Sequence, residues 1–108
     1  MEVSELNSIL KATGYTVAYT VFKTTPKPPF IVFIETGTDN FFADTKTYKK
    51  ISAWRVELYT NKKDINAEKK VEAALADLCW NRSETYINDE NVFENIYEFE
   101  TIEEINNG

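Results

Sequence analysis

The first hydrophobic pattern in the chain is helical and lies near the N-terminus. Apolar residues recur there at spacings of three and four, which places them on one face of a helix: Val3, Leu6, Ile9 and Leu10. Gly14 follows the last of them and lacks the side chain that hinders the left-handed conformation common at helix ends. The sequence therefore predicts an N-terminal helix that ends before Gly14.

An alternating pattern follows and predicts strands. Apolar and polar side chains alternate over residues 15–22 and again over residues 51–59, as in strands with one buried face. In the second segment we expect the buried face to carry Trp54, Val56 and Leu58, with Arg55, Glu57 and Tyr59 on the other face. The remaining elements here are a short apolar strand at residues 30–34, a turn at 37–40 and a strand at 41–43.

The second half of the chain begins with another helical stripe. Asp64 or Asn66 is the expected N-cap, and apolar positions continue the helix to residue 80 or 81: Val71, Leu75 and Leu78. Strands are then predicted at residues 85–87 and 92–102, joined by a turn at 88–91. In the last strand one face carries Phe93, Tyr97 and Phe99, and the other carries Ile96 among the glutamates.

The order of these elements predicts the fold class. A helix, several strands, a helix and two further strands suit two helices packed on one face of a mostly antiparallel sheet. A length of 108 residues fits one domain, residues 1–108. The sequence therefore predicts a single-domain α+β protein.

Three prolines interrupt the pattern between the first two strands. Pro26, Pro28 and Pro29 remove backbone donors and exclude both a helix and a central strand. The segment at residues 24–29 is therefore a loop. The sequence leaves open whether this loop is a rigid surface connection or one that grips a partner.

Charge is unevenly distributed along the chain, whose formal net charge is −6. Residues 46–70 hold eight basic side chains against three acidic ones, whereas residues 83–108 hold eight acidic side chains and no basic one. An acidic protein is a poor nucleic-acid binder. The asymmetry is consistent with two solvated faces, or with copies of the chain that attract one another head to tail.

The residue types present argue against catalysis. The chain has no histidine, one cysteine and three glycines, which excludes histidine dyads, a zinc site and a glycine-rich phosphate loop. We expect no catalytic residue, cofactor, metal or membrane span, and we expect Cys79 to be a small core residue. Carboxylates such as Asp39 and Asp44 leave a minor alternative, a hydrolase or a hard-cation site, which would need a cleft.

One pair of adjacent aromatic residues points to an interface. Consecutive strand residues face opposite ways, so Phe41 and Phe42 cannot both enter the same side of the sheet. Either one is simply buried against a neighbouring strand, or the exposed one serves a partner. Four further residues lie close by in the sequence: Lys46, Tyr48, Lys49 and Lys50.

Several short segments resemble a known family. The runs Pro28 to Phe33, Thr38 to Asp44, Val56 to Asp64 and Glu68 to Leu75, together with Tyr48, resemble small tail proteins of long-tailed phages and prophages of Gram-positive bacteria. The resemblance covers roughly residues 15–80. Members of this family are described as tail completion, tail terminator or head–tail joining proteins.

The resemblance implies a structural role in the virion. Such proteins have a sheet with helices on one face and form rings, commonly hexamers, that contact the tail tube protein or the head connector protein. DNA passes through the ring without being read. The protein would be made in the host bacterial cytoplasm, and the family supplies no catalytic residues.

Charge and resemblance together give a hypothesis for subunit contacts. A ring needs two different patches that meet between neighbours. We expect Lys46, Lys49 and Lys50 of one subunit to face Glu94, Glu98 and Glu100 of the next, with Phe41, Phe42 and Tyr48 nearby. The acidic strand lining a DNA channel is another possibility, and an acidic protein-binding or DNA-mimic inhibitor is the alternative function.

Overall fold

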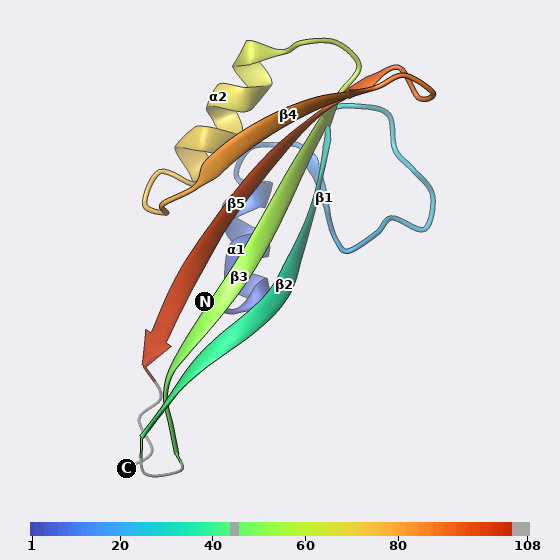
Figure 1. Ribbon diagram of the computed structural model, residues 1–108. Coiled ribbons are helices and arrows are strands. Elements are labelled where there is room, and N and C mark those ends of the chain that lie inside the picture. Colours follow the sequence, from blue (N-terminus) through green and yellow to red (C-terminus); the bar gives the residue numbers. More distant parts are fainter. Residues whose placement is uncertain (44–45, 105–108) are drawn as a thin grey trace.

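The computed structural model describes residues 1–43 and 46–104, which form two helices and five strands (Figure 1). The helices are α1 (Val3–Lys11) and α2 (Ile65–Ala74). The strands are β1 (Thr16–Tyr19), β2 (Phe30–Ala43), β3 (Lys46–Thr60), β4 (Asn81–Ile87) and β5 (Val92–Glu104). The predicted α+β class is confirmed.

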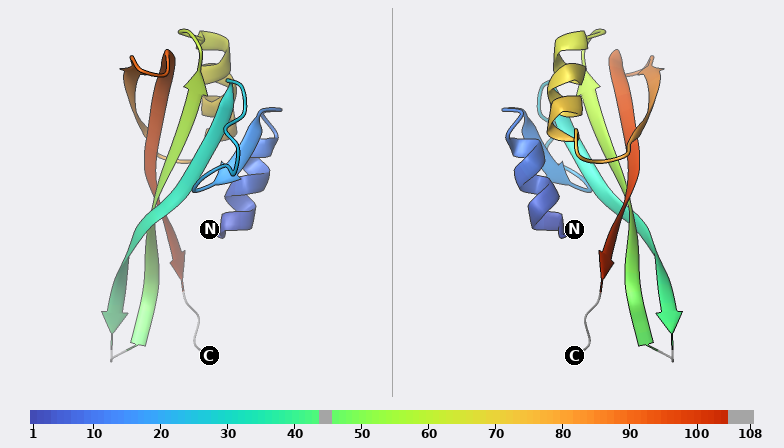
Figure 2. Two further views of the ribbon diagram at one scale, coloured as in Figure 1. Left: turned by 90° about the vertical axis from the view of Figure 1, so that its right-hand side faces the viewer. Right: turned by 90° about the vertical axis from the view of Figure 1, so that its left-hand side faces the viewer.

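All five strands belong to one sheet in the order β1-β2-β3-β5-β4. Only β1 and β2 run parallel among the described pairs, and the other pairs are antiparallel. Both helices lie on the same face of this sheet (Figure 2). The predicted arrangement, two helices on one face of a mostly antiparallel sheet, is therefore confirmed.

The core lies between the helices and that face. Leu6 and Leu10 of α1 are fully buried, as the helical spacing predicts. The alternation in β3 is also confirmed, because Trp54, Val56 and Leu58 are at most 1% exposed. The other buried members of the cluster are Ile31, Phe33, Ala67, Val71, Leu75, Tyr97 and Phe99.

Several side-chain hydrogen bonds join the strands to one another and to helix α2. The buried indole of Trp54 donates from Nε1 to Oγ1 of Thr101 at 2.8 Å. The hydroxyl of Tyr97 donates to Oε2 of Glu72 on α2 at 2.9 Å. These hydrogen bonds satisfy groups that burial would otherwise leave without partners, so they specify how the aromatic side chains pack.

Strands β2 and β3 extend past the helices as a long hairpin. We call residues 36–43 and 46–53 of this hairpin the arm; it projects beyond α1 (Figure 1). The arm makes the molecule elongated, with extents of 51 × 25 × 24 Å. The predicted turn at residues 37–40 is wrong, because pairing with β3 keeps this polar segment extended, with register shifts near Gly37 and Phe41.

Other boundaries also differ from the sequence prediction. Strand β1 ends at Tyr19 rather than at residue 22, because Thr20 has a left-handed φ of 67°. Helix α2 ends at Ala74 rather than near residue 80, and β4 starts earlier than predicted, at Asn81. Asn81 pairs with Glu98 of β5, so this residue belongs to the sheet and not to the helix.

Two local predictions fall in this region. Asp64 is the N-cap of α2, where its Oδ1 accepts from the amide of Ala67 at 3.0 Å. Cys79 is not a core residue but is exposed. Its neighbour Trp80 is the residue that packs inward, edge-on against Tyr97 with ring centroids 5.4 Å apart. Because α2 ends before it, Cys79 does not share the helical stripe.

Candidate functional site

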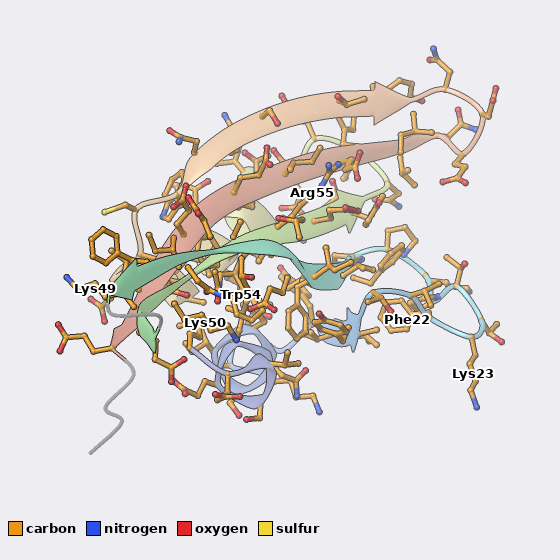
Figure 3. The ribbon with its side chains drawn as sticks, turned by 60° about the horizontal axis from the view of Figure 1, so that its bottom comes forward. Phe22, Lys23, Lys49, Lys50, Trp54 and Arg55 are labelled. Atoms are coloured by element: carbon orange, nitrogen blue, oxygen red, sulfur yellow. The ribbon has the colours of Figure 1, made fainter. Side chains whose placement is uncertain are left out.

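The sheet has one face that neither helix covers, which we call the open face (Figure 2). Figure 3 shows the alternation that creates it, with Trp54 on the helix side and Arg55 on the other side. The open face mixes apolar and charged residues of three strands: Val32, Ile34, Arg55, Glu57, Tyr59, Glu94, Ile96, Glu98 and Glu100. Half-buried apolar side chains among charged ones are typical of surfaces that bind other proteins.

The structure separates the predicted interface residues into two regions. Glu94, Glu98 and Glu100 lie along β5 on the open face, as the alternation predicts. Phe41 and Lys49 lie directly opposite each other on the arm, where both side chains are exposed. Three further predicted interface residues have side chains outside the described part of the structure: Phe42, Lys46 and Tyr48.

Two of the predicted lysines have acidic neighbours in their own chain. Lys49 pairs across the sheet with Glu104, and Lys50 pairs with Glu103. Opposite charges at such positions attract each other. The contact of these lysines with the acidic strand of a neighbouring subunit remains a prediction, and any such contact competes with these pairs.

A groove opens between the proline loop and the open face. Its volume is about 550 Å³. One side is lined by Val21, Phe22 and Pro26 of the connection between β1 and β2, and the other by Val32 and Val92 of the sheet. A volume of this size lies within the range of about 300–1,000 Å³ that is usual for sites that bind organic groups.

Three aromatic rings form a continuous wall of this groove. Phe22 meets Phe30 edge-on with ring centroids 5.5 Å apart. Phe30 in turn stacks on Tyr59 at 4.8 Å with an interplanar angle of 19°. The contacts join the proline loop to β2 and β3, so the loop is fixed against the sheet.

The polar end of the wall is a cluster around the Tyr59 hydroxyl. This hydroxyl lies 2.6 Å from Oε1 of Glu57 and 2.7 Å from Oε2 of Glu94. It carries one proton and can donate to only one carboxylate at a time. Burial, followed by the neighbouring Glu57, raises the pKa of Glu94, while burial and the two carboxylates raise the pKa of Tyr59.

Arg55 partly balances this negative cluster. Its Nε lies 3.0 Å from Oε2 of Glu57. A further acid, Glu90 in the turn between β4 and β5, also lines the groove. The groove therefore combines an apolar aromatic wall with a net negative rim, a combination that suits a side chain with an apolar stem and a cationic head.

The described residues offer little for other chemistry. Within residues 1–43 and 46–104, no group of three or more histidine, cysteine, aspartate or glutamate side chains is placed to hold a metal ion. Asp39 is exposed on the arm, and Asp44 lies outside the described residues. Among the same residues, no helix has the length and apolar character needed to cross a membrane.

Comparison with known proteins connects the fold to one solved assembly. No family model matches the sequence, and no curated protein matches it. The chain is similar in structure to a chain of the "virion of native gene transfer agent (GTA) particle", with a TM-score of 0.66 and 13% identity. The two chains share a fold. The match covers 91% of this chain and 86% of the other, so it extends over most of both chains rather than over one motif.

Sequence reasoning missed the groove, although part of its signal was present. The sequence left open whether the proline loop is a rigid surface connection or one that grips a partner. What the sequence did not reveal is that Phe22 and Phe30 continue the wall to Tyr59, because these contacts join residues far apart in the chain. Phe22 directly before the loop and Tyr59 opposite Phe30 were the available clues.

Proposed function

We propose that this protein is a structural component of a phage or phage-like virion. The observation that carries the proposal is the shared fold with a chain of a gene transfer agent virion, which extends over nearly the whole of both chains. The resemblance of residues 15–80 to small phage tail proteins is an independent argument for the same class.

Within the virion, the protein acts as a ring-forming tail terminator or head–tail joining protein. Its partners are further copies of itself and either the tail tube protein or the head connector protein. DNA passes through the ring without sequence-specific contacts. The role is structural rather than catalytic, and the ring is located at the tail or at the head–tail junction.

Two features of the fold support self-assembly. The open face carries half-buried apolar side chains, among them Ile34 and Ile96, that have no helix above them. The arm provides a second, chemically different surface at one end of the molecule. Two unlike surfaces on one subunit are what a heterologous ring interface needs.

Negative-stain microscopy of the concentrated protein, together with light scattering, tests this function. Rings of uniform diameter and a mass of several subunits are expected. Peptide mass spectrometry of purified particles from the source strain should also detect the chain. A protein that remains monomeric at high concentration, and that is absent from purified particles, would contradict the proposal.

The runner-up function is an acidic inhibitor that docks on a single partner protein. The alignment of Glu94, Glu98 and Glu100 on one exposed strand face favours it, since such a row can mimic the charges of a nucleic-acid backbone. An inhibitor of this kind is expected to be a monomer or a dimer in solution. A uniform ring in the microscope argues against it.

A further inference from the structure

The groove beside the proline loop is suited to bind two neighbouring side chains, one apolar and one positively charged. Phe22, Phe30 and Tyr59 give it an aromatic wall. Glu57 and Glu90 line it with carboxylates. Lys23 of the same loop points outward, away from the sheet (Figure 3), so it leaves the negative character of the groove intact.

The carboxylates at the end of the aromatic wall repel each other and are not fully neutralised. Glu57 and Glu94 both approach the single hydroxyl of Tyr59, and only one of them can receive its proton. Burial, followed by the neighbouring Glu57, raises the pKa of Glu94, which shows that negative charge is unfavourable there. An additional cation near Glu57 and Glu90 would reduce this repulsion, so the groove favours a positively charged occupant.

The arm carries a matching pair. Phe41 is 62% exposed, and Lys49 lies directly opposite it on β3. Side chains paired in this way stand on the same face of a sheet a few ångströms apart. An exposed aromatic ring beside an ammonium group complements an aromatic groove with an acidic rim, and a contact with that groove competes with the Lys49–Glu104 pair of the same chain.

The two features lie at opposite ends of the molecule. Figure 3 shows Lys49 at the arm end and Phe22 at the proline-loop end. The long dimension of 51 Å separates the ends, so the arm of a subunit cannot reach its own groove. A contact between them must join different copies, head to tail, and such contacts close into rings when the rotation between copies permits.

We propose that the groove receives Phe41 and Lys49 from the arm of a second copy of this chain. The Phe41 ring packs against Phe22 and Phe30, while the Lys49 ammonium lies near Glu90 and Glu57. This inference rests on the proposed ring-forming function and specifies which surfaces form the contact. It replaces Glu94, Glu98 and Glu100 with the groove acids as the partners of Lys49.

Charge reversal of the full-length chain tests the contact. Lys49→Glu and Glu90→Lys should each raise the concentration needed for assembly roughly tenfold or more, because each places like charges together. An equimolar mixture of the two variants should restore assembly, since each arm then meets a groove of opposite charge. Light scattering measures all three samples, and circular dichroism verifies that each variant is folded.

Asp89→Lys is the matched control, since Asp89 is exposed and adjacent to Glu90 but does not line the groove. It should leave assembly nearly unchanged. Equal weakening by Asp89→Lys and Glu90→Lys, or a mixture that fails to recover, would overturn the proposal.

Cross-linking gives a second, geometric test. In a Cys79→Ser background, Val21→Cys and Asp39→Cys proteins are mixed and treated with a short bismaleimide. Asp39 is exposed on the arm two residues before Phe41, so Phe41 and Lys49 both stay intact. Cross-linked pairs should form readily, whereas Ile65→Cys with Asp39→Cys should give few, because Ile65 is exposed on α2 away from the groove. Equal yields for both pairs would refute the contact.

The outcomes separate this inference from the proposed function. Rings that form normally while the reversal and cross-linking tests fail would refute the groove contact and leave the ring function standing. An unmodified protein that does not self-associate at any concentration would refute both.

Discussion

The hydroxyl of Tyr59 on β3 lies 2.7 Å from Oε2 of Glu94 on β5. Glu57 approaches the same hydroxyl to 2.6 Å, so two carboxylates compete for one proton. Burial and the nearby Glu57 raise the pKa of Glu94. The folded protein therefore holds a proton at this cluster more tightly than the unfolded chain does, and its stability depends on pH.

The sign of this dependence gives the first prediction. The contribution of Glu94 is fully present below the ordinary glutamate pKa of about 4.3 and is lost as pH rises through the raised pKa. Glu94→Gln removes this titration. The urea midpoint of the variant should therefore fall less than that of the unmodified protein between about pH 4 and pH 7.

Glu98→Gln is the control for this measurement. Glu98 lies further along the same face of β5 and is exposed. Its variant should retain the pH dependence of the unmodified protein. Parallel curves for the unmodified protein and Glu94→Gln would show that the cluster does not bind a proton as described.

Replacement by alanine should have opposite effects on stability at the two described glycines, Gly37 and Gly14. A Cβ on Gly37 meets nothing within 4 Å, and its φ is not positive. Gly37→Ala should stabilise the protein by about 0.4–1 kcal/mol, because it restricts the unfolded chain. Gly14 has a φ of +87°, so Gly14→Ala should destabilise it by roughly 1–2 kcal/mol. Urea unfolding measures both, and a shift of the same sign in both variants would contradict the prediction.

Lys63 binds two glutamates that differ in burial. Its Nζ lies 2.9 Å from Oε2 of Glu68 and 2.7 Å from Oε1 of Glu84. The side chain of Glu68 is 7% exposed and also accepts from Arg82, whereas that of Glu84 is 33% exposed. Glu68→Ala should therefore lower the free energy of unfolding by about 1–3 kcal/mol.

Glu84→Ala serves as its comparison. It removes a more exposed partner of the same lysine, so the loss should be about 0–1 kcal/mol. High salt should reduce the effect of Glu84→Ala more than that of Glu68→Ala, since solvent screens exposed pairs better. Equal losses for the two variants would mean that burial does not set the strength of this network.

The indole of Trp54 provides the fourth prediction. Its Nε1 donates to Oγ1 of Thr101, and Trp54 is 1% exposed. Thr101→Val keeps the shape of the side chain but leaves the N–H without this acceptor, so stability should fall by about 1–3 kcal/mol. Thr85→Val on exposed β4 should change stability by less than about 0.5 kcal/mol. An equal loss of stability in both variants would mean that the exchange of threonine for valine in a strand, and not the lost hydrogen bond, causes the change.

The open face illustrates how far alternation alone can predict a surface. The period of two in β3 separated Trp54 from Arg55 correctly, because neighbouring strand residues must face opposite ways. The same rule placed Glu94, Glu98 and Glu100 on one face of β5. It could not show that the lysines of the arm pair with Glu103 and Glu104 of their own chain, since register depends on how whole strands align.

The sequence by itself determined the fold class, helix α1 with its buried Leu6 and Leu10, and an N-cap of α2 at Asp64 or Asn66, of which the structure selects Asp64. These features depend on spacing and local hydrogen bonds, which a few consecutive residues specify. Only the tertiary structure decided that residues 37–40 extend into the arm and that Phe22, Phe30 and Tyr59 form one wall. Both depend on contacts between distant segments, because strand pairing satisfies backbone groups that a turn would have left to water.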